Sequence, residues 1–291
     1  TFMQDFMVPS NSIRIAVLSG KGGTGKTTVS VNLAYAIGNS YLIDCDIEEP
    51  NGNLFFKSDI KNIVDIKVKI PIINHSLCDG CRKCVDFCAF NALAYINNRV
   101  KVIEELCHSC GGCKIVCPKN AISEVDKLIG FIKTKEEGGV KVLTGELIPG
   151  IPSGTTIIKE LLKTKSDFPQ IIDCPPGTAC TVMEAIDGAD YCIIVGEPTI
   201  FGLANFKMVH ELLSEFNLKF GVIINKYYRN DKNIIENYCL DNNLKILAMI
   251  PYDNILAKDI SNGIIISSNN KVYKQLFKDI YKNIEREIKS L

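Results

Sequence analysis

The sequence has no net charge, no long apolar run and only three histidines, and these absences narrow the possible functions. Its 33 lysine and arginine residues balance its 33 aspartate and glutamate residues. No overall charge therefore favours nucleic acid or an anionic membrane surface as the main partner. No apolar stretch reaches the roughly 18 residues that a membrane-spanning helix requires. The three histidines are isolated from one another, and we interpret His108 as a solvated loop residue.

The composition is that of a folded globular protein with a sizeable core. Apolar residues make up 46% of the 291 residues and charged residues 23%, which excludes a disordered chain, a collagen and a coiled-coil rod. Residues 1–12 have neither a basic segment nor a continuous apolar segment. We therefore expect no secretory signal there and a cytoplasmic location.

Short apolar runs alternate with segments of helical periodicity along most of the chain. The runs predict strands at 13–19, 41–44, 170–173, 191–196, 220–225 and 246–250. The periodicity predicts helices at about 26–37, 202–216 and 232–243. This alternation is typical of a mostly parallel, doubly wound α/β sheet. It stops at about Lys67 and resumes near Gly139, so we interpret residues 13–66 and 127–291 as one domain interrupted by an inserted domain at 67–126.

Thirteen cysteines are the most unusual feature of the composition. Eight lie between Cys78 and Cys117, and we interpret the other five as small buried apolar residues. The second four of the eight follow the first four at a constant offset of 29 residues (107 − 78 through 117 − 88). Such clustered C-x-x-C spacing indicates metal ligation rather than a disulfide scaffold. The repeat predicts a small module with pseudo-twofold symmetry.

Each half of the repeat has the spacing C-x₂-C-x₂-C-x₃-C of bacterial ferredoxins, although Ala89 stands where proline is usual. In that pattern three cysteines of one run hold a [4Fe–4S] cluster and the fourth reaches the other cluster. One predicted set is therefore Cys78, Cys81, Cys84 and Cys117, and the other is Cys107, Cys110, Cys113 and Cys88. Two four-cysteine zinc sites are the alternative, but zinc does not account for the third and fourth cysteine of each run.

A glycine-rich segment after the first predicted strand fits the phosphate-binding pattern G-x-x-x-x-G-K-[ST]. Its residues are Gly20, Lys21, Gly22, Gly23, Thr24, Gly25, Lys26, Thr27 and Thr28. Backbone N–H groups of such a loop surround phosphates, and the following helix adds a favourable field. We expect Lys26 to reach the β- and γ-phosphates of ATP and Thr27 to bind Mg²⁺. The alternative is a glycine-rich turn without a ligand.

The string KGGTGKTT resembles the Walker A motif of the MinD, ParA and nitrogenase iron protein class of P-loop ATPases. In that class the first lysine contacts the nucleotide of a partner subunit. The resemblance therefore implies a nucleotide-bound dimer in which Lys21 acts in trans, much as an arginine finger does. The alternative for Lys21 is a solvated loop lysine.

Two further segments agree with this resemblance. The Asp-Cys-Asp sequence after the second predicted strand resembles an element of the class, which implies that Asp44 belongs to the Mg²⁺ shell and that Asp46 orients the attacking water. The strand that ends at Asp173 resembles the Walker B element, followed by switch II. This implies that Asp173 holds Mg²⁺ through water and that Gly177 lies near the γ-phosphate. The alternative for the three aspartates is a capping or turn role.

The resemblance covers the chain from residue 13 onward, apart from the insertion. It extends to Asn225 and Pro251, which correspond to the base pocket of the class, where Asn225 would contact adenine. The expected fold is that of a MinD-like P-loop NTPase: an α/β, doubly wound, mostly parallel sheet. The insertion is expected to be a small α+β domain like a bacterial ferredoxin.

The combination of motifs predicts an ATPase that couples a nucleotide-driven dimer cycle to electron transfer through two [4Fe–4S] clusters. The cofactors are then ATP or ADP, Mg²⁺ and the clusters, and the partners are a second copy or a related chain and a redox protein. A carrier or assembly ATPase for iron–sulfur clusters is one alternative. A positioning ATPase whose module docks or senses is another. We expect no nucleic acid partner and no membrane binding, because the amphipathic segment 272–291 has mixed charge on its polar face.

Overall fold

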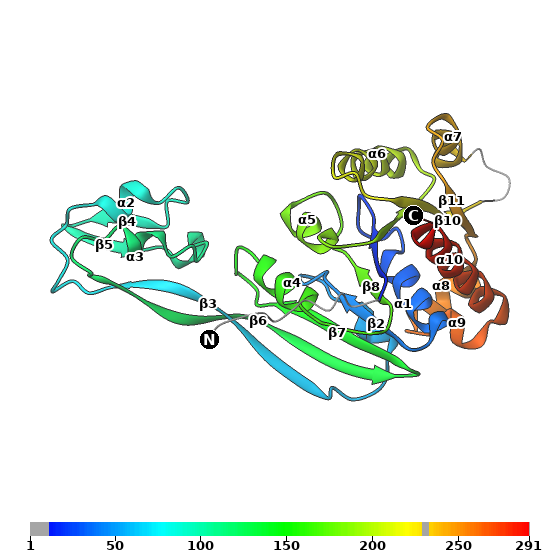
Figure 1. Cartoon of the computed structure of the whole chain (residues 1–291), viewed down its shortest axis with the longest axis horizontal. Coiled ribbons are helices and arrows are strands. Elements are labelled where there is room, and N and C mark those ends of the chain that lie inside the picture. The colour runs from blue at the N-terminus through cyan, green and yellow to red at the C-terminus, as the bar shows by residue number, and fades with distance from the viewer. Residues whose placement is uncertain (1–11, 229–232, 291) are drawn as a thin grey trace.

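The computed structural model describes residues 12–228 and 233–290, which form one large sheet covered by helices and a small module held away from it (Figure 1). Residues 1–11, for which we expect no secretory signal, lie outside the described residues. So do Lys232, at the start of a predicted helix, and the last residue, Leu291.

Nine strands of the described chain form the large sheet. Neighbours run parallel in the order β11 (Ile246–Pro251), β10 (Phe220–Tyr227), β9 (Tyr191–Gly196), β1 (Arg14–Leu18), β8 (Gln170–Asp173), β2 (Ser40–Asp44) and β7 (Val140–Leu147). The strands β6 (Ile122–Glu137) and β3 (Asn62–Ile73) follow in antiparallel pairing and end at the edge. The predicted α/β fold with a mostly parallel sheet is confirmed.

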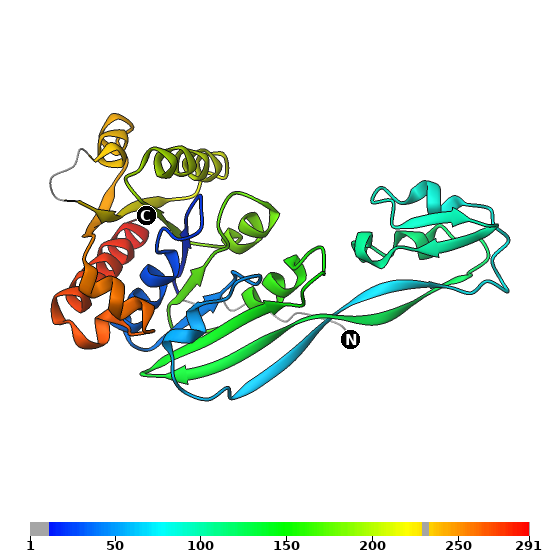
Figure 2. The ribbon, with the colours of Figure 1, turned by 180° about the vertical axis from the view of Figure 1, so that it is seen from behind.

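Helices cover both faces of this sheet, which explains why its central strands are almost wholly apolar. One face carries α4 (Thr155–Leu162), α5 (Cys180–Ile186), α6 (Ile200–Glu215) and α7 (Ile234–Asp241). The other carries α1 (Lys26–Ile37), α9 (Ile266–Asn269) and α10 (Lys271–Lys289), with α8 (Asn254–Ser261) beside them (Figure 2). Helix α10 buries Phe277, Ile280 and Ile284 against this layer, as its apolar spacing predicts. The described part of the chain contains no helix of the length and apolar character that a bilayer span needs.

The scattered cysteines follow the sequence interpretation with one correction. Cys45, Cys174, Cys192 and Cys239 are buried, whereas Cys180 is exposed. Cys180 is the first residue of α5, and its place at a helix end, which apolarity alone does not reveal, leaves it accessible.

A long two-stranded ribbon of β3 and β6 leaves the sheet and carries the module at its far end (Figures 1 and 2). The strands pair from Asn62 opposite Thr134 to Ile73 opposite Ile122, with a register shift between Ile66 and Lys67. The segment 67–126 therefore begins and ends inside these strands, close to the point where the register shifts.

The two halves of the module repeat the same backbone at the offset of 29 residues. Helices α2 (Lys83–Phe87) and α3 (Gly112–Ile115) begin at corresponding positions. Left-handed backbone conformations also recur in pairs: Gly80 and Ser109, Arg82 and Gly111, Asn91 and Asn120. A hairpin of β4 (Leu93–Ile96) and β5 (Arg99–Val102) completes the module, with the short helix η2 (Glu104–Leu106) after it.

Hydrogen bonds between the halves obey the same repeat. The N–H of Asn74 donates to the carbonyl oxygen of Ala121, and the N–H of Ile103 donates to that of Ala92, both at 2.8 Å. Residue 74 corresponds to residue 103 through the offset of 29, and residue 92 corresponds to residue 121. The two bonds are therefore equivalent, with the halves exchanged. The halves are thus related by a pseudo-twofold axis, as the sequence repeat predicts.

Candidate functional site: a phosphate-loop cavity and two cysteine-lined cavities

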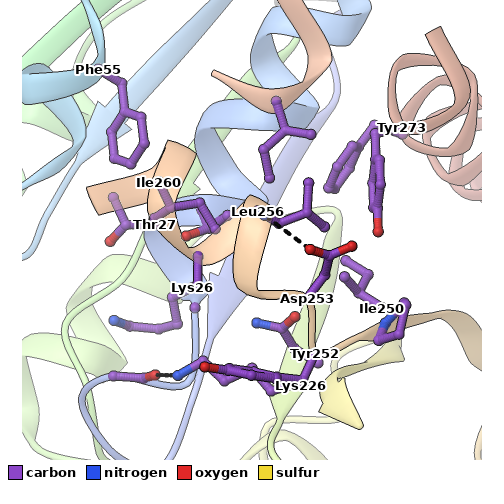
Figure 3. Close-up of a pocket in the computed structure, with 18 of the residues that line it drawn as sticks. Lys26, Thr27, Phe55, Lys226, Ile250, Tyr252, Asp253, Leu256, Ile260 and Tyr273 are labelled. Atoms are coloured by element: carbon purple, nitrogen blue, oxygen red, sulfur yellow. Dashed lines mark hydrogen bonds between the residues drawn. The ribbon is translucent and has the colours of Figure 1, made fainter. Parts of the chain in front are cut away.

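A cavity of about 450 Å³ lies beside the glycine-rich loop, where β10 and β11 end (Figure 3). The loop contributes Gly23, Gly25, Lys26, Thr27 and Thr28. Asn225 and Pro251 line the same cavity. The fold therefore brings together the residues predicted to bind phosphate and the two predicted to form the base pocket, which lie far apart in the sequence.

The glycine-rich loop is tied to the end of β10 by side chains. Asn225 Nδ2 donates to the carbonyl oxygen of Thr24 at 2.7 Å, and Lys226 Nζ donates to that of Gly23 at 2.5 Å. Gly25 has a φ of 99°, and a Cβ there would overlap Asn225 Nδ2. The hydroxyl of Thr24 is buried without a hydrogen-bond partner, so this loop keeps an unpaired polar group that a phosphate can satisfy.

Three carboxylates, those of Asp44, Asp46 and Asp173, influence one another, and two of them, Asp46 and Asp173, also interact with the buried amino group of Lys26. Lys26 Nζ lies 3.8 Å from Asp46 Oδ2. Asp44 is fully buried, and its Oδ2 accepts a bond of 2.9 Å from the N–H of Gly52, at the start of the short helix η1 (Gly52–Phe55). Asp173 is also fully buried; its Oδ1 accepts from Ser30 Oγ at 3.0 Å, whereas its Oδ2 has no partner.

The burial of these carboxylates disfavours their negative charge. Burial, and then the charge of Asp173, raise the pKa of Asp44 well above its ordinary range. Burial also raises the pKa of Asp173, against the opposing effects of Lys26, Thr27 and Ser30. The pKa of Asp46 rises to about 6 for the same reason, although Lys26 lowers it. Because a bound cation would offset this cost, the carboxylates and the unpaired Asp173 oxygen fit a site for Mg²⁺.

The chemistry of these residues also limits how Mg²⁺ could be held. No three His, Cys, Asp or Glu side chains in residues 12–228 and 233–290 are placed to bind a metal ion directly. Mg²⁺ commonly keeps several waters and takes its other ligands from one or two side chains and from phosphates. Thr27 as a direct ligand, with Asp44 and Asp173 acting through water, is compatible with the described geometry.

The other predicted residues lie around the phosphate loop. Lys21 Nζ is 3.2 Å from Glu197 Oε2 of its own chain. The N–H of Gly177 donates to the carbonyl oxygen of Ser19 at 2.9 Å, and Gly177 has a φ of 91°. A Cβ on Gly20 would overlap the backbone of Asn205 in α6, so this glycine permits close helix packing. Gly22 has open space around it.

Sequence reasoning missed one wall of the cavity. Helix α8 contributes Leu256 and Ile260, and Phe55 and Tyr273 approach from other elements (Figure 3). Asp253 caps α8, because its Oδ1 accepts from the N–H groups of Ile255 and Leu256. The capping aspartate before a short amphipathic segment is the signal that could have identified this helix.

The eight cysteines of the module line two separate cavities. A small cavity of about 20 Å³ is bordered by Cys78, Cys81, Cys84 and Cys117. A larger cavity of about 150 Å³ is bordered by Cys88, Cys107, Cys110 and Cys113. These groups are the two sets predicted from the spacing, including the exchange of the fourth cysteine between the halves.

Two of these thiols receive a backbone N–H group. The N–H of Ser109 points at Cys107 Sγ at 3.4 Å, and the N–H of Ala121 points at Cys117 Sγ at 3.3 Å; such contacts stabilise cluster-bound sulfur. Burial raises the pKa of Cys113 to about 11, which favours the neutral thiol over the thiolate that binds metals. No three of these thiols, among the described residues, are placed to bind one metal ion. The fit to two clusters therefore rests on which cysteines line each cavity and on the chemistry of thiol ligands.

Comparison with known proteins agrees with the nucleotide-binding geometry. Residues 15–266 match the CobQ/CobB/MinD/ParA nucleotide binding domain. An uncharacterized protein of Methanocaldococcus jannaschii is 31% identical over 95% of this chain and 98% of its own length. An iron–sulfur cluster carrier protein of Aquifex aeolicus is 26% identical over 97% of this chain and 70% of its own length.

Among solved structures, the septum site-determining protein MinD of Pyrococcus horikoshii, complexed with Mg-ADP, is 25% identical. It aligns with a TM-score of 0.59 over 94% of this chain and 96% of its own. The family match spans most of the chain and includes the glycine-rich loop, both aspartate elements and the residues predicted for the base pocket. The chain therefore belongs to the CobQ/CobB/MinD/ParA family of nucleotide-binding domains.

Proposed function

We propose that this chain is an ATPase in which MgATP binding closes a dimer, and that this cycle controls electron transfer to a partner protein through two [4Fe–4S] clusters. The observation that carries the proposal is the division of eight cysteines between two cavities, each bordered by one complete set. Because the nucleotide site and both cluster sites are on one chain, ATP binding and hydrolysis can alter the clusters directly. When bound, the clusters supply one-electron carriers.

The nucleotide half of the proposal assigns a task to each buried group. Lys26 neutralises charge on the β- and γ-phosphates, and Thr27 binds Mg²⁺. Asp46, which lies 3.8 Å from Lys26 Nζ, orients the water that attacks the γ-phosphate. Lys21 exchanges Glu197 for the nucleotide of the partner subunit when the dimer closes. Asn225, which lines the same cavity, contacts the adenine base.

The cluster half assigns the two cysteine sets as ligands. Cys81 and Cys110 are exposed, so each cavity has one ligand position close to solvent and to a docked partner. The other ligands are partly or fully buried, which favours retention of the clusters.

The test is to purify the full chain without oxygen, measure iron and sulfide per chain, and record EPR spectra after reduction. The proposal predicts about eight iron atoms and eight sulfides per chain, which follows from two clusters of four, with two reducible signals. Two zinc ions per chain without sulfide would contradict it. An ATPase assay of the same sample, with Lys26→Ala as the control, tests the nucleotide half separately.

An iron–sulfur carrier or assembly ATPase is the second candidate, and the similarity to the Aquifex aeolicus carrier protein favours it. A carrier releases its cluster, whereas an electron-transfer protein retains it. Incubation of the loaded protein with a cluster-free acceptor separates the two functions. ATP-dependent transfer of iron to the acceptor supports the carrier, and retention of iron through repeated ATP turnover supports electron transfer.

A further inference from the structure

The two cysteine sets differ in their contact with the nucleotide-binding part of the chain. A cavity of about 80 Å³ lies between the second half of the module, the ribbon and the loop before α4. Cys107, His108 and Ser109 form its module side, and residues 151–153 with Thr155 form its opposite side. The module and α4 lie on the same side of the ribbon (Figures 1 and 2). The set that contains Cys107 therefore adjoins the nucleotide-binding domain.

Two ion pairs fix the second half of the module to the ribbon. Lys114 Nζ lies 2.9 Å from Glu124 Oε2, and Lys127 Nζ lies 3.0 Å from Glu104 Oε2. The positions that correspond to Lys114 and Glu104 in the first half are Val85 and His75. The first half therefore has no lysine and no glutamate at the two corresponding positions. The two halves differ at the residues that connect the module to the ribbon.

The loop before α4 is also packed against Ile47, a neighbour in sequence of the predicted water-orienting residue Asp46. This residue follows Asp46 directly, and 2% of it is exposed. A Cβ on Gly154, the N-cap of α4, would overlap Ile47 Cδ1, and a Cβ on Gly145 in β7 would lie 2.7 Å from Ile47 Cγ2. The N–H of Leu147 donates to the carbonyl oxygen of Ile47 at 2.8 Å. The start of α4 therefore has no free space into which Ile47 can move.

We propose that Ile47 and the loop before α4 transmit the nucleotide state to the cysteine set Cys88, Cys107, Cys110 and Cys113. The inference rests on the proposed function and specifies how the two halves communicate. In a closely packed interior, a small displacement of one side chain makes its neighbours shift to another discrete arrangement. When Asp46 adjusts to a γ-phosphate, Ile47 displaces the start of α4 and with it the wall that faces Cys107. Ile47 is a positioning residue, and the other cysteine set responds less.

Hydrogen–deuterium exchange on the full chain tests the transmission without depending on activity. The anaerobic protein is compared in MgADP and in Mg²⁺ with a non-hydrolysable ATP analogue. We expect exchange to change at least twofold in peptides covering 104–111 and 151–156. Ile47→Val, which removes the methyl group next to Gly154, should abolish the change in 104–111 and leave nucleotide affinity within twofold.

The matched control is Ile280→Val, since Ile280 is equally buried but lies on α10, on the opposite face of the sheet. It should keep the full nucleotide-dependent change. The inference is overturned if Ile47→Val also keeps that change, or if Ile280→Val loses it as well.

EPR redox titration then identifies which cysteine set responds. Cys110→Ser marks the signal of the adjoining set, because it alters one ligand of that set. The nucleotide-dependent shift in midpoint potential should belong to that signal and fall by at least half in Ile47→Val. A shift carried by the other signal would contradict the inference. Absence of both signals would refute the proposed function, whereas the exchange experiment would still decide whether Ile47 transmits the nucleotide state.

Discussion

The side-chain amide of Asn225 donates a hydrogen bond of 2.7 Å to the carbonyl oxygen of Thr24, and it occupies the space that a Cβ on Gly25 would need. Residues from β10 and from the phosphate loop, 201 positions apart, thereby fix one another. The end of β10 and the phosphate loop are thus held together by this contact.

This contact predicts that Gly25→Ala weakens nucleotide binding. The new methyl group would displace Asn225, and the φ of 99° strains any residue other than glycine by about 1–3 kcal/mol. We expect MgADP affinity to fall about tenfold or more. Gly22→Ala is the matched control, because nothing lies within 4 Å of a Cβ there. Calorimetric titration of both variants measures the difference, and equal affinities would disprove the role of the contact.

Asp46→Asn should separate binding from hydrolysis. The variant keeps the shape of the side chain but loses the carboxylate that we propose orients water, so we expect kcat to fall about a hundredfold. MgATP should still bind, since Lys26 and Thr27 are unchanged. Glu48→Gln, an exposed carboxylate two positions further on, should hydrolyse ATP normally. If Asp46→Asn does not bind MgATP, Asp46 is needed for nucleotide binding and the proposed role in orienting water is contradicted.

Lys21 gives a test of action across a dimer. Lys21→Ala and Asp46→Asn should each lower hydrolysis about a hundredfold or more. A mixed dimer of the two variants contains one site with an intact Asp46 and an intact Lys21 from the partner. Mixing should therefore restore a measurable part of the activity. If Lys21 acts within its own chain, no mixture recovers activity.

The raised pKa of Asp46 predicts a pH dependence of stability in the nucleotide-free, metal-free protein. Its pKa of about 6 lies above the ordinary 3.8, so the folded chain binds this proton more tightly than the unfolded chain. The resulting stabilisation is fully present below pH 3.8 and is lost as pH rises through about 6.

Asp46→Asn should accordingly have a higher Tm than the wild type at pH 7.5, and this advantage should shrink at pH 5.5. Comparing the two proteins at each pH cancels other groups, such as His210, whose pKa is lowered by burial and which opposes the trend. A Tm difference that does not change with pH would show that Asp46 is not destabilised by its charge.

Cysteine substitutions should distinguish the proposed cluster ligands from exposed cysteines that bind no cluster. Cys110 and Cys180 are both exposed, but Cys110 borders the larger cavity and Cys180 begins α5. We expect Cys110→Ser to lose or alter one of two EPR signals and to lower the iron content. Cys180→Ser should retain both signals and all iron. Similar loss of iron in the two variants would point to general damage rather than loss of a ligand.

The parts of this molecule that were predictable are those governed by local pattern. Buried parallel strands give apolar runs, so β8 and β9 were placed from 170–173 and 191–196 without error. The C-x₂-C-x₂-C-x₃-C spacing likewise predicted which cysteines share a cavity, because in bacterial ferredoxins the fourth cysteine of each run reaches the other cluster.

The ribbon and the α8 wall depend on contacts between distant segments, and local pattern did not reveal them. In β3, Ile63 and Val64 are adjacent and both exposed, so no alternation marks a strand with one buried face. The same long-range packing makes Tyr273 of α10 part of the wall of the cavity beside the phosphate loop. The close approach of Ile47 and Gly154 also depends on long-range packing, because the segment after β2 and the N-cap of α4 meet only in the folded chain.

The central claim is that nucleotide binding and the clusters are energetically linked. An EPR-monitored redox titration of the anaerobic full chain, first in MgADP and then with a non-hydrolysable ATP analogue, measures this linkage. We predict that at least one midpoint potential shifts by about 59 mV or more, which is a tenfold change in a one-electron equilibrium. Two signals whose potentials are the same in both nucleotides would contradict the account.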